Sequence, residues 1–178
     1  MDTLRFRLAD DTDLATVVGL RDDAARWMLS RGVTGQWRPG ELGVDHFRRT
    51  RERGGEVWLA ESGERAVGAW ELWWEDEAAW GPQPATAGYV HRLMVAHGSV
   101  PPGTGRELLR AAERRVAERG RPLARLDCVA TNPALKAYYI KAGYRVVGHK
   151  EGKPQPGTKP KSFTLLEKRV SGAAAQSA

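Results

Sequence analysis

The sequence predicts a single α/β domain in which one mixed β-sheet is flanked by helices. The chain has 178 residues, which fits one domain of ordinary size and is long enough to bury a hydrophobic core. Strand-like and helix-like patterns follow one another in the order β-α-α-β-β-β-α-β-α-β-β. Since no linker interrupts this series, we expect one domain that covers residues 1–170.

Seven segments have the residue pattern of β-strands. In the first, Leu4, Phe6 and Leu8 alternate on one face, as in a half-buried strand. The second and third are joined by the turn SGER and form a hairpin, and the last two are expected to be antiparallel neighbours. The expected strands are residues 3–9, 56–61, 66–74, 86–96, 123–130, 144–150 and 161–169.

Four segments have helical patterns, and turn residues mark several of their ends. Asp10 and Asp11 are placed to cap the first helix. Asn132 and Pro133 begin the last helix, and Gly143 ends it. Between the helices and strands we expect EDEAAWGPQP to be a loop, and SGAAAQSA to be a flexible tail. The expected helices are residues 13–29, 44–53, the segment from the Gly-x-Gly motif to about 120, and 131–143.

Composition narrows the classes of function. No run reaches the roughly 18 apolar residues of a membrane helix, and the N-terminus lacks the apolar region of a secretory signal. We therefore expect a cytoplasmic protein without a membrane partner. With one cysteine, Cys128, and no ligand spacing around His46 or His97, we expect neither a disulfide nor a metal. The net charge of +6 by itself favours an anionic partner, such as nucleic acid, an acidic membrane or a phosphorylated cofactor.

The segment VPPGTGREL at residues 100–108 raises the sharpest question about function. Two prolines lead into Gly-x-Gly, and a helical pattern follows at once. A helix N-terminus presents free N–H groups and a partial positive charge, and glycines let a phosphate approach the backbone. Gly-x-Gly also occurs in ordinary turns, so its spacing alone leaves both a phosphate cradle and a simple loop open.

Three segments in order, YVHRLMV, GTGRELL and TNPALKAYYIKAGYRVVG, resemble the GNAT superfamily of N-acetyltransferases. The third is the most specific, because Asn132, Tyr139, Gly143 and Tyr144 match the family's spacing of Asn, Tyr, Gly and an aromatic residue. The order of the elements agrees as well, and the resemblance covers roughly residues 3–169. It implies a GNAT-like fold and transfer of an acetyl group from acetyl-CoA to a primary amine.

The resemblance also implies where acetyl-CoA binds. The Gly-x-Gly segment becomes the cradle for the pyrophosphate, and backbone amides of the central strand bind the acetyl oxygen. One departure stands out: Val100 replaces the family's Arg or Gln, and Pro101 and Pro102 have no N–H to donate. The implied cofactor-binding residues are Leu93, Met94, Val95, Gly103, Thr104, Gly105, Arg106, Asn132 and Tyr139.

The reaction needs an acid for the departing thiolate and a group that takes a proton from the amine. The resemblance implies that Tyr139 is the acid. An alkyl amine is mostly protonated at pH 7, because its pKa lies near ~10.4. Candidate bases are His91, in YVHRL, and Glu71, in AWELWW, with a chain of water molecules as the third route.

The acceptor is expected to be a small amine, held in part by aromatic side chains. Trp37, Trp27 and either Trp73 or Trp74 are candidates to wall its site, because aromatic faces bind cations. The alternatives are a macromolecular amine, on a protein or an aminoacyl-tRNA, and a non-catalytic acyl-CoA-binding module. In the long helix, acidic residues alternate with the arginines and dilute any basic patch, which disfavours a nucleic-acid partner. The resemblance leaves a homodimer open, and the sequence shows no interface signature.

Overall fold

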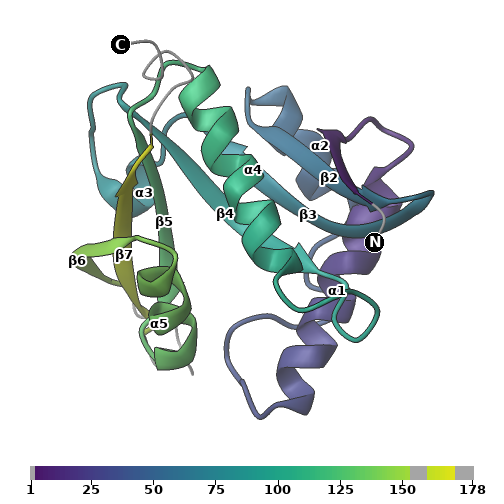
Figure 1. The fold of residues 1–178 in the computed structure, drawn as a ribbon. Helices are drawn as coiled ribbons and strands as arrows, with labels where there is room; N and C mark the ends of the chain where they lie inside the picture. Colours follow the sequence, from purple (N-terminus) through teal and green to yellow (C-terminus); the bar gives the residue numbers. More distant parts are fainter. Residues whose placement is uncertain (1–2, 153–159, 171–178) are drawn as a thin grey trace. The chain divides into compact units, whose positions relative to one another are not determined.

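A computed structural model describes residues 3–152 and 160–170. Its seven strands form one mixed sheet in the order β1-β2-β3-β4-β5-β7-β6. This arrangement, with helices beside the sheet, confirms the predicted fold class. The strands are β1 (Leu4–Leu8), β2 (Glu56–Ser62), β3 (Arg65–Trp73), β4 (Ala87–Val95), β5 (Leu123–Val129), β6 (Arg145–Glu151) and β7 (Ser162–Arg169). Figure 1 shows them coloured along the chain.

The helices agree with the sequence except at two points. The N-cap position of the first helix is Asp13 rather than Asp10 or Asp11, and the Asp13 side chain makes no capping hydrogen bond; the Asp10 carboxylate accepts the N–H of Thr12, before the helix begins. A short helix lies in the segment expected to be a loop, since Asp76 accepts the N–H of Ala79 and caps it. The helices are α1 (Leu14–Ser30), α2 (Val44–Glu52), α3 (Glu77–Trp80), α4 (Thr104–Glu118) and α5 (Pro133–Lys141).

The contacts divide the chain into two compact units. The first comprises Met1–Trp73 and Val90–Ala112, and the second comprises Trp74–Tyr89 and Glu113–Ala178. Strand β4 and helix α4 therefore contribute residues to both units. The expected flexible tail, residues 171–178, lies outside the described residues.

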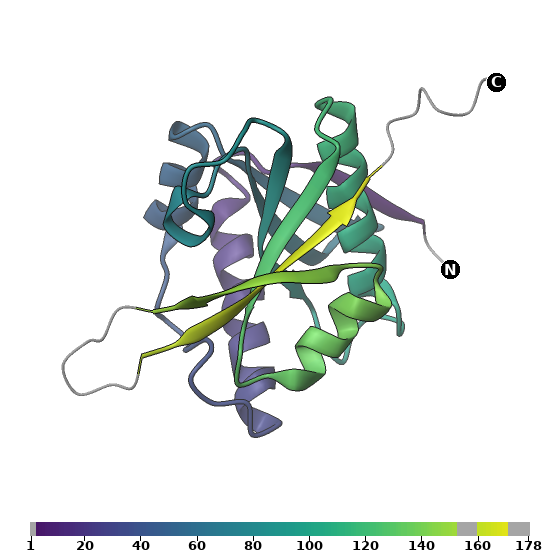
Figure 2. The same cartoon turned by 90° about the vertical axis from the view of Figure 1, so that its left-hand side faces the viewer.

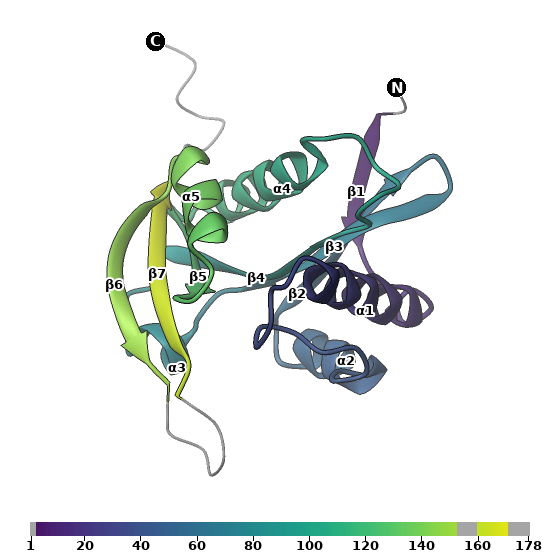
Figure 3. The same ribbon diagram turned by 90° about the horizontal axis from the view of Figure 1, so that it is seen from below.

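In the first unit, α1 and α2 cover one face of the antiparallel strands β1, β2 and β3 (Figure 3). Their apolar residues build a buried core from α1, α2, β2, β3 and β4, with Leu14, Phe47, Leu59, Ala69 and Met94 among its members. The start of α4 packs on the opposite face. Gly68 permits this, because a Cβ there would lie 2.4 Å from Leu108 Cδ2.

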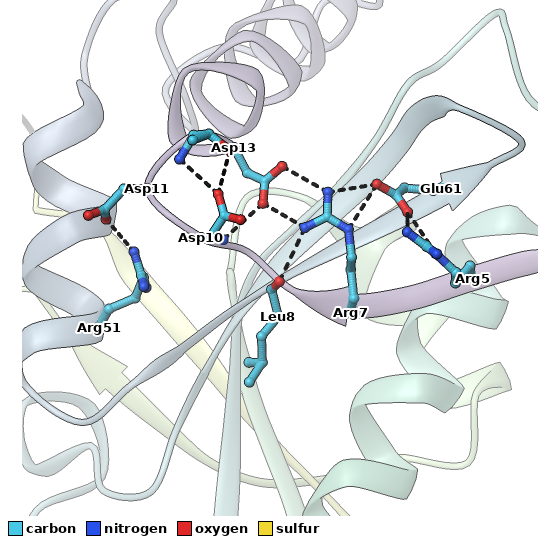
Figure 4. Close-up of polar contacts among 9 residues, drawn as sticks. Arg5, Arg7, Leu8, Asp10, Asp11, Asp13, Arg51 and Glu61 are labelled. Carbon is cyan, nitrogen blue, oxygen red and sulfur yellow. Dashed lines mark hydrogen bonds and ion pairs between the residues drawn. The ribbon is translucent and has the colours of Figure 1, made fainter.

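Charged residues on the helix-covered face tie β1 to its neighbours. Arg5 and Arg7 follow the alternation that turns Leu4, Phe6 and Leu8 to the other face. The guanidinium of Arg7 binds Asp13 at 2.6 Å and Glu61 at 2.7 Å, and Arg5 binds Glu61 at 2.9 Å (Figure 4). These four residues, Arg5, Arg7, Asp13 and Glu61, are called the Arg7 cluster below. The cluster joins β1, β2 and the N-terminus of α1.

In the second unit, β5 pairs in parallel with the start of β4 and antiparallel with β7, whose other neighbour is β6 (Figure 2). The predicted antiparallel pairing of the last two strands is confirmed. Arg125 on β5 binds Glu167 on β7 at 2.9 Å, and both side chains are buried. Helix α5 begins as predicted, because the Asn132 side chain accepts the N–H of Leu135 and Pro133 follows it. None of the described helices is both long and apolar enough to cross a membrane.

Candidate active site

The carboxylate of Glu71 is the most completely buried charge in the first unit. Glu71 lies on β3, with no exposed surface, and points to the face that α2 covers. Its oxygens contact three side chains. His46 Nε2 lies 3.2 Å and 3.3 Å from the two oxygens, the Thr50 hydroxyl donates to Oε1, and Arg92 donates to Oε2 at 2.7 Å. These four residues are called the Glu71 cluster below.

The same contacts decide the protonation of Glu71. Burial by itself would raise the pKa of this carboxyl group. Hydrogen bonds from His46 and Thr50 and the positive charge of Arg92 act in the opposite direction and hold its pKa at about 2. Glu71 is therefore ionised at neutral pH, and a carboxylate this weakly basic holds a proton poorly.

Arg92 marks a kink in β4. Its φ of 49° is the one positive φ found at a non-glycine residue in the described part of the chain. Such a conformation costs free energy and persists where surrounding contacts hold it, here the ion pair with Glu71. His91, before the kink, is partly buried, and Met94, after it, is fully buried in the core. The predicted acetyl-binding residues Leu93, Met94 and Val95 thus follow directly on the kink.

The loop after β4 turns into α4 at the predicted cradle. Gly103 adopts a φ of 94°, and no atom lies within 4 Å of the place where a Cβ would stand. Inside the turn, the Thr104 hydroxyl donates to the Pro101 carbonyl at 2.8 Å, and the Arg106 N–H donates to the Gly103 carbonyl at 2.9 Å. The hydroxyl proton of Thr104 is therefore used in a hydrogen bond within the loop. Pro101, which lacks an N–H, contributes its carbonyl instead.

The three tryptophans predicted to wall the acceptor site lie in three different surroundings. Trp27 stacks on His97 with ring centroids 3.7 Å apart. Trp37 packs against the core, beneath the guanidinium of Arg21. Trp73 lies beside Gly55 at the start of β2. Among the residues that the structure describes, no ring pair joins two of these tryptophans, so an aromatic box formed by them remains a prediction.

Arg21 explains how the loop that contains Trp37 is held. Although charged, Arg21 is buried, and it donates to the Arg38 carbonyl at 2.5 Å and to the Glu41 carboxylate. The neighbouring Asp22 accepts the N–H of Gly40 at 3.0 Å. Two consecutive residues of α1 thus fix the segment between α1 and α2.

The second unit holds the remaining predicted residues. Tyr139 is buried on α5, with its ring edge-on to Tyr138 at 5.5 Å and to Tyr144 at 6.0 Å. Burial raises the pKa of its phenol well above the ordinary value, so the group keeps its proton at neutral pH. Asn132 caps α5. Cys128 is buried, and burial raises the pKa of its thiol to about 11.

Sequence reasoning missed three members of the Glu71 cluster: His46, Thr50 and Arg92. One signal was available, since His46 and Thr50 are four residues apart and so lie on one face of a helix. The partner of that face, Glu71, comes from a distant strand. No local pattern gives that pairing.

The family model described as "Acetyltransferase (GNAT) family" matches residues 22–144, which contain the kinked strand, the glycine turn and Tyr139. The chain belongs to the GNAT family. It is an acetyl-CoA-dependent N-acetyltransferase, and the resemblance seen in its sequence motifs is confirmed.

Two relatives agree with this assignment. This chain is 29% identical, over 153 residues, to the "Uncharacterized N-acetyltransferase YesJ" of Bacillus subtilis (strain 168). The match covers 76% of this chain and 78% of the relative. A GNAT-family acetyltransferase of Listeria monocytogenes has a similar structure, with a TM-score of 0.73 and 26% identity, covering 94% and 95% of the two chains.

A second solved structure shares the fold. It is YncA of Salmonella typhimurium, a putative acetyltransferase solved with its cofactor acetyl-CoA. The TM-score is 0.66 at 15% identity, and the match covers 98% of each chain.

Proposed function

We propose that this N-acetyltransferase acetylates the primary amine of a small molecule, by direct attack of the amine on acetyl-CoA in a ternary complex. The observation that carries the proposal is that the first unit contains both the kink at Arg92 and, at the start of α4, Gly103, which has open space around it. A kinked strand frees backbone N–H groups for the acetyl oxygen, and a helix N-terminus attracts phosphate. Acetyl-CoA requires both.

The cradle residues remain the proposed binding site of the pyrophosphate, but their backbone amides do not all contribute equally. The amides of Gly103 and Gly105 are the proposed phosphate donors, because those of Thr104 and Arg106 donate to carbonyls of the turn. The Arg106 side chain supplies positive charge at the first turn of the helix. Family resemblance assigns the pantetheine contact to Asn132 and the proton donated to the leaving thiolate to Tyr139, whose raised pKa keeps that proton in place.

Two features support a small amine over a nucleic acid. Two of the four arginines of the basic segment HFRRTRER form ion pairs within the chain, since Arg48 binds Asp45 at 2.6 Å and Arg51 binds Asp11. The loop that holds Trp37 is also fixed by Arg21, which suits a preformed site for a compact ligand. Trp27, Trp37 and Trp73 remain the proposed acceptor-binding side chains. Acetylation that falls steeply with rising salt would favour a polyanionic acceptor instead.

The cofactor part of the proposal is tested by calorimetry with acetyl-CoA. We expect the wild type to bind and Gly103→Asp to lose binding, because the added carboxylate repels the pyrophosphate. Gly54→Asp is the matched control, since Gly54 also has a positive φ, 86°, and open space around it. Equal binding by both variants would place the pyrophosphate elsewhere. A wild type that binds acetyl-CoA is then screened for thiol release with primary amines.

A further inference from the structure

We propose that His46 accepts the proton of the acceptor's ammonium group, and that Glu71 positions its imidazole for this step. The assignment rests on the proposed function, for which it supplies the base. It moves this role from the sequence candidates Glu71 and His91 to a residue on α2. Glu71 stays in the site as a positioning residue.

The geometry selects one nitrogen of His46 as the acceptor. Nε2 faces both oxygens of an ionised carboxylate, so it carries the hydrogen and donates it. Nδ1 is then the unprotonated nitrogen, and no hydrogen bond to it is found within residues 3–152 and 160–170. A carboxylate that fixes the tautomer and orientation of an imidazole also stabilises the imidazolium that forms, as in Ser-His-Asp triads.

The location of His46 suits a group that meets solvent and substrate. Its side chain is 24% exposed, whereas that of Glu71 is 0% exposed. The imidazole and the Phe47 ring lie nearly perpendicular to each other, with centroids 5.0 Å apart. An imidazole is therefore held at the surface of a buried anion, where it can reach an amine while the carboxylate cannot.

A chain of contacts links His46 to the proposed acetyl site. Both carboxylate oxygens of Glu71 face His46 Nε2, and Oε2 also accepts a hydrogen bond from Arg92, the kinked residue of β4. Leu93, the next residue, begins the segment proposed to bind the acetyl oxygen. All four residues of the Glu71 cluster belong to the first unit.

The proposed reaction moves two protons and exchanges a C–S bond for a C–N bond. The ammonium group of the acceptor gives one proton to His46 Nδ1, which passes it to solvent after turnover. The lone pair of the neutral amine forms the new C–N bond at the thioester carbonyl. When the C–S bond breaks, its electron pair leaves on sulfur, the nitrogen loses a second proton, and the thiolate gains one. The products are the acetylated amine and coenzyme A.

The test compares two amines of different basicity. Benzylamine is mostly an ammonium ion at pH 7, whereas methoxyamine is mostly neutral and needs no proton removed before attack. For His46→Gln we expect kcat/KM to fall about 100-fold with benzylamine, as for loss of a general base. With methoxyamine it should fall less than about threefold. His149→Gln, at an exposed position on β6, is the control and should resemble the wild type with both amines.

The outcomes separate this proposal from the proposed function. Equal loss with both amines would mean that His46 is only structural, and no loss with either would mean that it is not the base. Calorimetry on His46→Gln should show acetyl-CoA bound as tightly as by the wild type. Acetyl-CoA binding by the wild type without turnover of either amine would contradict the small-amine function and the base role together.

The positioning role of Glu71 has a readout of its own. Three charged groups lie near the imidazole of His46. Glu71 on β3 contacts it directly, Arg92 on β4 binds Oε2 of Glu71, and Asp45 precedes His46 on α2. Glu71→Gln keeps the shape and removes the negative charge. We expect kcat/KM to fall about tenfold with benzylamine and less than about threefold with methoxyamine, because the imidazole loses the carboxylate that orients it. Equal loss with both amines would contradict the role.

Discussion

The Arg7 cluster and the Glu71 cluster are alike in chemistry and different in what they hold together. Each places an ionised carboxylate between cationic or donor side chains, and the pKa values of Asp13 and Glu71 both lie at about 2. In the Arg7 cluster the partners are arginines only, and the residues tie together β1, β2 and α1. In the Glu71 cluster one partner is a histidine and another is the kinked residue of β4.

The difference teaches that a depressed pKa alone does not identify a functional carboxylate. Arg7 is about one-third exposed, and its cluster closes secondary structure at the surface. Glu71 is fully buried, where an ion pair is a costly way to gain stability compared with apolar packing. What distinguishes the Glu71 cluster is the exposed imidazole that it orients beside a strained strand.

The largest expected effect is acid destabilisation through both clusters. The pKa of Asp13 falls from 3.8 to about 2, first because of the hydrogen bond from Arg7, and that of Glu71 falls from 4.5 to about 2. Both carboxyl groups bind protons more tightly in the unfolded chain. Their stabilising contribution is therefore complete above about pH 5 and is lost as the pH falls through about 2.

Melting temperatures measured between pH 7 and pH 2 check this prediction. Asp13→Asn and Glu71→Gln should each lower stability at neutral pH and flatten its dependence on acid. If either variant keeps the slope of the wild type, its carboxyl group does not have the depressed pKa.

The next effect is the cost of removing one carboxylate from each cluster. Glu71→Ala leaves the Arg92 guanidinium without its acceptor and the buried Thr50 hydroxyl with only its longer hydrogen bond to the His46 carbonyl, so the free energy of unfolding should fall by about 3 kcal/mol. Glu61→Ala should cost about 1 kcal/mol or less, because Arg5 is 72% exposed and Arg7 keeps Asp13. Urea denaturation measures both. Equal losses would remove the distinction between the clusters.

The smallest predicted effect concerns the two arginines. Arg92→Gln removes the ion pair that holds the kink, so kcat/KM for an alkyl amine should fall about tenfold, equivalent to ~1.4 kcal/mol of transition-state stabilisation. Arg7→Gln should change kcat/KM less than about twofold, since its cluster supports only the fold. Steady-state thiol release with benzylamine checks the pair, and a larger loss for Arg7→Gln would reverse the roles assigned to the clusters.

Much of the fold was predictable because it rests on local patterns. Leu4, Phe6 and Leu8 alternate as a strand requires, and Asn132 with Pro133 marks the start of α5, where the structure places it. The short helix α3 was missed, because four residues are too few for a period to emerge. The N-cap position of α1 was misplaced by two or three residues, since three aspartates precede the helix and the one at the N-cap position, Asp13, makes no capping hydrogen bond through its side chain.

The candidate site also contains residues that a local pattern indicates and residues that only the fold brings together. The glycine turn and Tyr139 stand in motifs of consecutive residues, so the sequence alone indicated them. The Glu71 cluster could not be found in that way, because its members come from α2, β3 and β4, and only the folded sheet brings them together. The kink at Arg92 gives no signal either, since arginine has no preference for a positive φ.

The most direct measurement is a crystal structure with a bisubstrate compound, in which the sulfur of coenzyme A is joined through an acetyl linker to benzylamine. We predict that the amide nitrogen lies within about 3 Å of His46 Nδ1, or one water molecule from it. The linker oxygen should accept a backbone N–H from the segment after Arg92, and the pyrophosphate should rest on Gly103 and Gly105. A nitrogen far from His46, with the imidazole still bound to Glu71 and facing away, would contradict the account.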